Sequence, residues 1–362
     1  MKRDVPHLFI PGPTEVRPEI LHVLSQPVIS HRGPRIEAIT RRIFEDLGEL
    51  FRTQQECFVA CSSATGLMEA AVRNLSGKKI LSTVCGAFSE RQYQTAVKCG
   101  RPATRLGVAA GKPIDLAEVD RELATGAYDL VTAVHSETST GVLNPIAELG
   151  ELVRRYDDVL LAVDCVSSLG GAPFETDLWG VDLAFAGTQK CLALPPGLTV
   201  FTVSARAMDR SAAAESRGHY FDFQLYRKMA AKGQCPATTN IPLLRALGVQ
   251  LDHILREEGL EERWGRHLAL AERVRGHLAE RFPLFPDAGF MTPSESVFLA
   301  DGRLSPSALV DELLKRGKRI GAGYGDLKET TFRIGHLGDL TLNDIDGLLA
   351  DLDATLEGMG IS

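Results

Sequence analysis

Residues 157–197 read DDVLLAVDCVSSLGGAPFETDLWGVDLAFAGTQKCLALPPG, and the architecture of the chain follows from them. Two short apolar runs, 159–163 and 181–186, end abruptly in polar or small residues. Continuous apolar runs of this length between turn residues predict strands that are buried on both faces of a parallel sheet. Asp164 follows the first run, and Lys190 ends the Gly-Thr-Gln-Lys turn after the second. Because the carboxyl ends of such strands line the binding crevice, we expect both side chains in one cleft.

A carboxylate and an amine at neighbouring strand ends are the pair that pyridoxal 5′-phosphate (PLP) chemistry requires. The lysine forms the covalent link to the cofactor, and the acid keeps the pyridine nitrogen protonated. Taken alone, Asp164 is explained as a turn cap and Lys190 as a solvated strand end. With Gln189 beside the lysine and a serine-rich loop upstream, the two together predict a PLP site.

Composition limits the classes to which the chain can belong. Its 362 residues suffice for two domains, and a net charge of -7 argues against a nucleic-acid partner. The sequence has no apparent signal peptide and no apolar run of about 18 residues, so we expect a cytoplasmic protein with no membrane partner. Of the seven cysteines, Cys57 and Cys61 are closely spaced. No second pair completes a zinc site, so we predict reduced thiols and no metal.

Strands and helices alternate through the first two thirds of the chain. Residues 5–18 are rich in proline and glycine and predict an ordered arm, and 35–52 place apolar residues on one helical face. A strand at 57–61 leads through a small-residue turn into a helix that ends near Leu75. The further elements expected here are strands at 79–84, 129–134 and 197–203 and helices at 90–98 and 145–156. This alternation predicts a doubly wound, mostly parallel sheet of the α/β class.

The pattern changes after Arg245. The elements expected in this part are a long charged helix at 255–282, strands at 297–300 and 331–337, and a helix at 306–316. Thr341 and Asp344 form a start like a capping box for a last helix that runs to about Leu356. We therefore expect a large PLP-binding domain over 14–252. A smaller α+β domain would combine the arm, 1–13, with 253–362.

With these residues placed, the chain resembles the class V aminotransferases of PLP fold type I, in particular the alanine–glyoxylate/serine–pyruvate aminotransferase group. The likeness runs from PGPT (11–14) to TFRIGHLG (331–338). Between them lie HSETSTGVLNP (135–145), AVDCVSSLGG (162–171) and AGTQKCLALPPG (186–197), in the order of the family. The resemblance implies PLP as cofactor and a homodimer whose subunits share active sites.

The resemblance also assigns roles at the cofactor ring. Lys190 matches the lysine that binds PLP as a Schiff base and then moves a proton between the substrate α-carbon and C4′ of the cofactor. Asp164 matches the partner of the pyridinium nitrogen. Phe88, where the family often has Trp or another aromatic residue, and Val166 would pack on the two ring faces. Thr138 matches a hydroxyl that bonds the 3-oxygen of the ring.

Phosphate and substrate contacts follow from the same motifs. The backbone N–H groups of Ser63 and Ala64, with the Gln189 side chain, match the phosphate cradle. Arg333 matches the arginine that grips the substrate α-carboxylate in a bidentate fork. Gly12 would offer its backbone to the same carboxylate.

One stretch departs from the family pattern. A TPYTPA-like segment contributes a Tyr or Thr to the phosphate site of the neighbouring subunit, and here this segment reads CPATTN (235–240). Ala237 stands at the Tyr position. Thr238 or Thr239 would have to make the contact across the dimer.

The implied function is transfer of an amino group from alanine or serine to glyoxylate or pyruvate. An alternative is a phosphoserine aminotransferase that uses 2-oxoglutarate, because His31 and Arg32 stand where such enzymes hold the substrate phosphate with a His-Arg pair. His336 would add a third group near that phosphate. In the opposing interpretation, Arg32 pairs with a carboxylate such as Glu37 or with an acid of the neighbouring subunit.

Two further classes are weighed against this function. Cysteine desulfurases and lyases of the same fold carry a histidine stacked on the ring and another just before the lysine. This chain has Phe88 and Gln189 at those positions, and none of its cysteines lies in an evident flexible loop. A non-enzymatic subunit that kept the fold would have no structural need for Lys190, Asp164 and Arg333 together.

Overall fold

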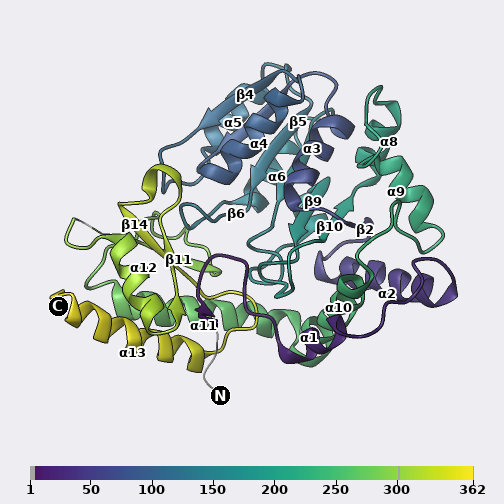
Figure 1. The fold of residues 1–362 in the computed structure, drawn as a ribbon. Helices are drawn as coiled ribbons and strands as arrows, with labels where there is room; N and C mark the ends of the chain where they lie inside the picture. The colour runs from purple at the N-terminus through teal and green to yellow at the C-terminus, as the bar shows by residue number, and fades with distance from the viewer. Residues whose placement is uncertain (1–4, 301, 362) are drawn as a thin grey trace.

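The computed structural model describes residues 5–300 and 302–361, and a twisted seven-stranded sheet forms the centre of the described chain (Figure 1). In spatial order its strands are β2 (Glu56–Ala60), β10 (Thr199–Val203), β9 (Leu183–Gly187), β8 (Leu160–Asp164), β5 (Leu130–Val134), β3 (Ile80–Val84) and β4 (Ala103–Gly107). The strands from β9 to β4 run parallel to one another. The expected doubly wound, mostly parallel sheet is therefore confirmed.

Strand β10 runs against the rest of the sheet. It is antiparallel to both β9 and β2, with Thr199 paired to Gly187 on one side and to Ala60 on the other. Strand β10 follows β9 through residues 188–198, which contain no crossover helix, and only an antiparallel neighbour can be reached without one. This register brings the end of β2 close to the turn that contains Lys190.

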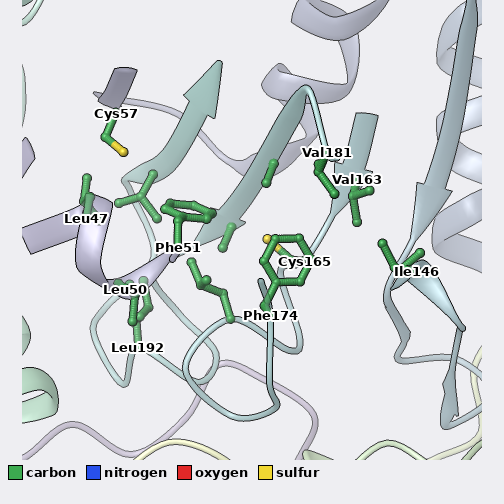
Figure 2. Packing of buried hydrophobic residues seen from close by; sticks show 14 of the residues in the cluster. Leu47, Leu50, Phe51, Cys57, Ile146, Val163, Cys165, Phe174, Val181 and Leu192 are labelled. Carbon is green, nitrogen blue, oxygen red and sulfur yellow. The ribbon is translucent and has the colours of Figure 1, made fainter. Parts of the chain in front are cut away.

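Helices cover both faces of the sheet. One face carries α3 (Ala64–Leu75), α4 (Ala87–Lys98), α8 (Ala205–Ala213) and α9 (Phe223–Ala230). The other carries α2 (Pro34–Leu50), α5 (Leu116–Leu123), α6 (Ile146–Val153) and α10 (Ile241–Asp252), with the short α1 (Pro18–Leu24) and α7 (Thr176–Trp179) beside them. On β8, Leu160 and Ala162 pack on the first layer and Leu161 and Val163 on the second, as the alternation of side chains along a strand requires. Figure 2 shows part of the hydrophobic core between the sheet and the second helix layer, including Phe51, Phe174 and Val181.

A separate core forms in the carboxyl-terminal part of the chain. Strands β11 (Glu295–Leu299), β14 (Thr331–Gly335) and β13 (Gly321–Ala322) form an antiparallel sheet, packed with α11 (Leu260–Leu278), α12 (Pro306–Lys315) and α13 (Leu342–Gly358). The amino-terminal arm joins this unit, because β1 (His7–Leu8) pairs with β12 (Lys318–Arg319) and Phe9 is buried in its core. Two smaller elements are the hairpin of β6 (Ser136–Glu137) and β7 (Val142–Leu143) and a 3₁₀ turn at Gly325–Leu327. The domain boundary at residue 252 stays a prediction, since Ile254 and Leu260 beyond it pack against the large sheet's core.

The prediction of one continuous helix over 255–282 is wrong. Helix α10 passes into a π-helical segment, η1 (His253–Glu258), and the helix is interrupted at Gly259 before α11 begins. Gly259 has φ +90, a conformation that other residues rarely adopt, and a Cβ there would lie 2.3 Å from Glu262 Oε2. The expected capping box of the last helix is confirmed at Thr341 and Asp344. Within residues 5–300 and 302–361, no helix has the length and apolar character needed to cross a membrane.

Candidate active site

A cavity of about 580 Å³ lies where the turn after β9 meets the arm and the small domain. We call it the Lys190 cavity. Its walls come from the arm (Ile10, Pro11, Gly12, Pro13), from Phe88, Thr138, Gln189, Lys190 and Pro196 of the large domain, and from Arg319, Tyr324, Arg333 and residues 320–323 of the small domain. Of the predicted site residues, it brings together Gly12, Phe88, Thr138, Gln189, Lys190 and Arg333.

Lys190 is 7% exposed, and its amine is held by two hydroxyls. Nζ donates to Thr138 Oγ1 at 3.0 Å and to Ser167 Oγ at 2.9 Å, and it lies 5.4 Å from the centre of the Phe88 ring. Burial lowers the pKa of the amine, because the charged form loses its hydration. A neutral amine is the nucleophilic form of lysine, so the site favours covalent chemistry at Nζ.

The arm approaches Lys190 so closely that residue 12 has to be glycine. A Cβ on Gly12 would lie 3.1 Å from Cδ and Cε of Lys190, and its φ of +113 is strained for any other residue. The backbone of Gly12 therefore forms one wall of the cavity directly beside the reactive amine.

Asp164 is the last residue of β8 and is 4% exposed. Its Oδ1 accepts a hydrogen bond from the Val166 N–H at 2.9 Å, and no other donor among the described residues reaches the carboxyl group. Burial raises the pKa of Asp164 to about 7 even though the positive charge of Lys190 acts in the opposite direction. A protonated ring nitrogen is the kind of partner that would hold this carboxylate ionised.

The turn before α3 offers hydrogen-bonding groups without partners, near the turn that contains Lys190. Ser63 is the amino-terminal cap of α3, and its side chain makes no cap bond. The Gly66 N–H donates to the Ser63 carbonyl at 2.9 Å, whereas the N–H groups of Ala64 and Thr65 have no partner among the described residues. Ser62 Oγ is buried and, in the part of the chain that the structure describes, has no partner. Ser62 is tied to the lysine turn through β10, because its carbonyl accepts from Thr199 Oγ1 and Thr199 pairs with Gly187. Orphaned donors at a helix start fit a phosphate group, so the residues present fit PLP.

Arg333 lies on β14 and reaches into the cavity. Its Nη1 donates to the Thr138 carbonyl at 3.2 Å and its Nε to the Ala322 carbonyl at 3.0 Å, while the guanidinium lies 5.6 Å from the centre of the Tyr324 ring. No carboxylate of the described residues forms an ion pair with it, and burial lowers its pKa. A fixed, half-buried arginine without an acid partner is suited to bind a carboxylate from a ligand.

His31, Arg32 and Thr239 lie elsewhere in the chain. With Cys235 and Gln234 they line a much smaller hollow, which we call the Arg32 hollow. Arg32 Nη1 donates to the carbonyl oxygens of His31 at 3.3 Å and Cys235 at 3.5 Å.

Glu37, near the Arg32 hollow, and His336, in the small domain, correct two expectations. Glu37 accepts from Gln234 instead of pairing with Arg32. Thr238 is exposed, and Thr239 Oγ1 is buried with no described partner. His336 is fully buried, bonded to Ser296 Oγ at 2.9 Å, and has a pKa well below its ordinary value, so it adds no positive charge near a substrate.

Sequence reasoning missed four residues of the site region. Ser167, a partner of the lysine amine, stands inside the AVDCVSSLGG motif and could have been found there. Tyr324, whose ring centre lies 5.5 Å from that of Phe88, and Arg319 come from loops and edges that carry no local signal. Glu295 is a buried acid of β11, whereas an acidic residue at the start of a short strand is expected to be exposed.

Comparison with known proteins gives a consistent result. The sequence model of the family Aminotransferase class-V matches residues 18–285. The chain is 31% identical to the serine–glyoxylate aminotransferase of Methylorubrum extorquens, over 98% of this chain and 92% of that protein. It is 32% identical to the L-aspartate–glyoxylate aminotransferase of Paracoccus denitrificans, over 92% and 87%. The solved structure of an alanine–glyoxylate aminotransferase from Nostoc sp. superposes with a TM-score of 0.93 at 28% identity, covering 98% of this chain and 96% of that one.

Proposed function

Because this chain belongs to the class V aminotransferases, and is therefore a PLP-dependent transaminase of fold type I, we propose that the Lys190 cavity moves an amino group from alanine or serine to glyoxylate or pyruvate. The observation that carries the proposal is that Lys190 and Arg333 open into one cavity. Arg333 has no described acid partner there, and burial lowers the pKa of Lys190. Glyoxylate is the acceptor in the names of all three relatives compared above, which supports a small 2-oxo acid here.

The residues of the proposed cofactor site divide by the part of PLP that they would hold. Lys190 would hold it covalently and Asp164 at the ring nitrogen. The remaining contacts would come from Phe88 and Val166 at the ring faces, Thr138 at the 3-oxygen, and Ser63, Ala64 and Gln189 at the phosphate. When bound, PLP withdraws electrons from the α-carbon of the substrate, so that its hydrogen leaves as a proton.

The chain's own groups then bind the substrate and move its proton. The free Nη2 of Arg333, together with Nη1, offers a bidentate fork to the α-carboxylate, and the Gly12 backbone borders the same space. Lys190 Nζ takes the proton from the α-carbon, and its lowered pKa makes the neutral, proton-accepting amine available nearer neutral pH. Asp164 keeps the ring nitrogen protonated with its buried carboxylate.

One observation favours a second class of donor. Arg319 lines the Lys190 cavity, and its guanidinium has no hydrogen-bond or ion-pair partner among residues 5–300 and 302–361. A second carboxylate, such as that of aspartate, would find a cation there. Arg319→Gln should then raise KM for aspartate about tenfold and leave alanine unchanged, whereas the exposed Arg316→Gln changes neither. Equal effects on both donors would remove aspartate from the proposal.

The alternative functions receive less support. A substrate phosphate at His31 and Arg32 would have to reach the Arg32 hollow, whose lining shares no residue with the Lys190 cavity. A desulfurase requires a reactive thiolate near the cofactor. No cysteine lines the described cavity, and burial raises the pKa of Cys191, which follows Lys190, so it stays protonated.

We infer further that the enzyme acts as a homodimer in the cytoplasm. Neither Thr238 nor Thr239 lines the Lys190 cavity of its own chain, so a phosphate contact from them would serve the partner's site. The buried Thr239 hydroxyl without a partner supports such a contact. All seven cysteines are free thiols, as expected in a reducing compartment.

A panel of half-reactions tests the proposed function. The purified holoenzyme is mixed with each candidate amino acid in the absence of an acceptor, and the visible absorbance of the cofactor is followed. We expect rapid loss of the band with alanine or serine, and its return when glyoxylate or pyruvate is added. A protein that reacts with phosphoserine but not with alanine or serine would contradict the proposal.

A further inference from the structure

Glu295 is the most unusual charged residue near the Lys190 cavity. Its side chain is fully buried, and neither carboxylate oxygen has a hydrogen-bond partner within the described residues. Buried carboxylates are normally satisfied by donors, and an orphaned one is costly. The proposed reaction assigns no task to this group.

The sheet register places Glu295 on the same face as Arg333. Glu295 pairs with Gly335 and Val297 pairs with Arg333 across β11 and β14, and directly paired residues of antiparallel strands project to one side. Glu295 and Arg333 are therefore diagonal neighbours, with only a glycine opposite Glu295. A Cβ on Gly335 would lie 2.2 Å from the Ile10 carbonyl, so the arm that lines the cavity crosses this same face.

Cations surround Glu295 at longer range. Lys190 and Arg333 are the positive groups that act most strongly on its carboxyl, and Arg275 acts more weakly while donating to the Glu295 carbonyl at 3.1 Å. Glu137 of β6 adds an opposing negative charge. Two further titratable groups nearby are neutral: His336, whose pKa lies well below the ordinary value, and Cys191, whose pKa burial raises to about 12.

Substrate loading changes this charge balance. In the proposed function, on which this inference rests, Lys190 is already committed to the cofactor in the holoenzyme, and Arg333 pairs with the incoming α-carboxylate. Arg333 is then shared with the ligand, and a second negative charge enters the same buried region. A buried carboxylate that loses its counter-charges takes up a proton rather than remain ionised.

We propose that Glu295 takes up a proton when a substrate carboxylate binds at Arg333, so that carboxylate binding by this enzyme is coupled to protonation. Glu295 acts through Arg333 and touches neither substrate nor cofactor, so it is a positioning residue. Burial raises the pKa of Glu295 to about 7, and the coupling therefore operates at physiological pH. The affinity for a carboxylate falls as the pH rises through 7, because the ionised Glu295 competes for Arg333.

Proton uptake on ligand binding tests the proposal without turnover. Glycolate carries the carboxylate but no amino or oxo group to transfer. Its binding to the holoenzyme is measured by calorimetry at pH 8 in two buffers of different ionisation enthalpy, which gives the number of protons taken up per site. A carboxyl with a pKa of about 7 is about nine-tenths ionised at this pH, so a large fraction of one proton is expected. E295Q should lack this uptake and bind glycolate more tightly at pH 8, up to about tenfold.

Two controls separate this inference from other causes. E151Q removes an exposed acid of α6 and should take up protons as the wild type does. E295Q removes no described hydrogen bond, so its melting temperature at pH 8 should not fall. Equal uptake by the wild type and E295Q, or a pH-independent glycolate affinity in the wild type, overturns the proposal. Failure of the proposed function is a different result, namely an Arg333→Gln variant that still binds glycolate normally.

Discussion

The Lys190 cavity and the Arg32 hollow differ in how complete they are within one chain. In the first, the lysine amine is held by two hydroxyls and Arg333 by two carbonyl oxygens. In the second, His31 is exposed and the buried Thr239 hydroxyl has no described partner. The sequence predicted that His31 and Arg32 border the active site and that Thr238 or Thr239 reaches the active site of the neighbouring subunit. The difference supports the proposal that a single chain builds the reactive centre and that the Arg32 hollow serves a second chain.

The largest effect is expected in the Lys190 cavity, on removal of the lysine side chain. Lys190→Ala eliminates both the covalent link and the base, so we expect kcat with alanine and glyoxylate to fall by at least about 1,000-fold. Its thermal unfolding should stay close to that of the wild-type apoprotein, because the amine bonds only two hydroxyls. Turnover near the wild-type rate would rule out the assignment of this cavity.

Asp164→Asn should act on the same cavity with a somewhat smaller effect. The amide keeps the shape of the side chain but cannot stabilise a proton on the ring nitrogen, so we expect half-reaction rates to fall by about 100-fold or more while PLP still binds. Stopped-flow absorbance with alanine measures this. Unchanged half-reaction rates would mean that Asp164 is a structural residue of β8.

Arg333→Ala should affect binding more than chemistry. Hydrogen bonds to charged groups contribute about 1.5–3 kcal/mol, so KM should rise roughly 10- to 100-fold, and by a similar factor for every α-amino acid. Arg316→Ala, an exposed arginine after α12, is the control and should leave KM unchanged. If only one amino acid were affected, Arg333 would recognise a side chain instead of the shared carboxylate.

The Arg32 hollow should give the smallest effect. If Thr239 contacts the cofactor phosphate of the partner, Thr239→Val should weaken PLP retention by about 2- to 12-fold, the range that corresponds to a typical net hydrogen bond of about 0.5–1.5 kcal/mol. Dialysis followed by measurement of bound cofactor gives this number, and apoprotein melting should not change. If the variant retained PLP as well as the wild type does, the Arg32 hollow would have no role in cofactor binding. The Lys190 cavity would then bind the cofactor without a second chain.

The sequence predicted the strand-end residues of the Lys190 cavity better than it predicted features set by connections and distant packing. Asp164 and Lys190 were predictable because Asp164 ends a strand buried on both faces and Lys190 lies in the turn directly after another, and the carboxyl ends of parallel strands meet at one edge of the sheet. The direction of β10 and the break at Gly259 were not, because the length of a connection and one backbone angle decide them.

Long-range packing explains the remaining misses. Glu295 is buried by β14 and the arm, which are distant in sequence. The Arg32 hollow is closed by residues 233–244, some 200 positions after Arg32, so no local pattern could place it outside the Lys190 cavity.

Chemical trapping of the cofactor tests the central claim most directly. Borohydride reduces the double bond between a lysine amine and PLP to a stable single bond, which survives digestion and mass spectrometry. The structure predicts that the holoenzyme loses its visible absorbance on reduction and that the added pyridoxyl mass is found on the peptide that contains Lys190. Attachment at another lysine, or no attachment in a catalytically active preparation, would contradict the assignment of the Lys190 cavity as the active site.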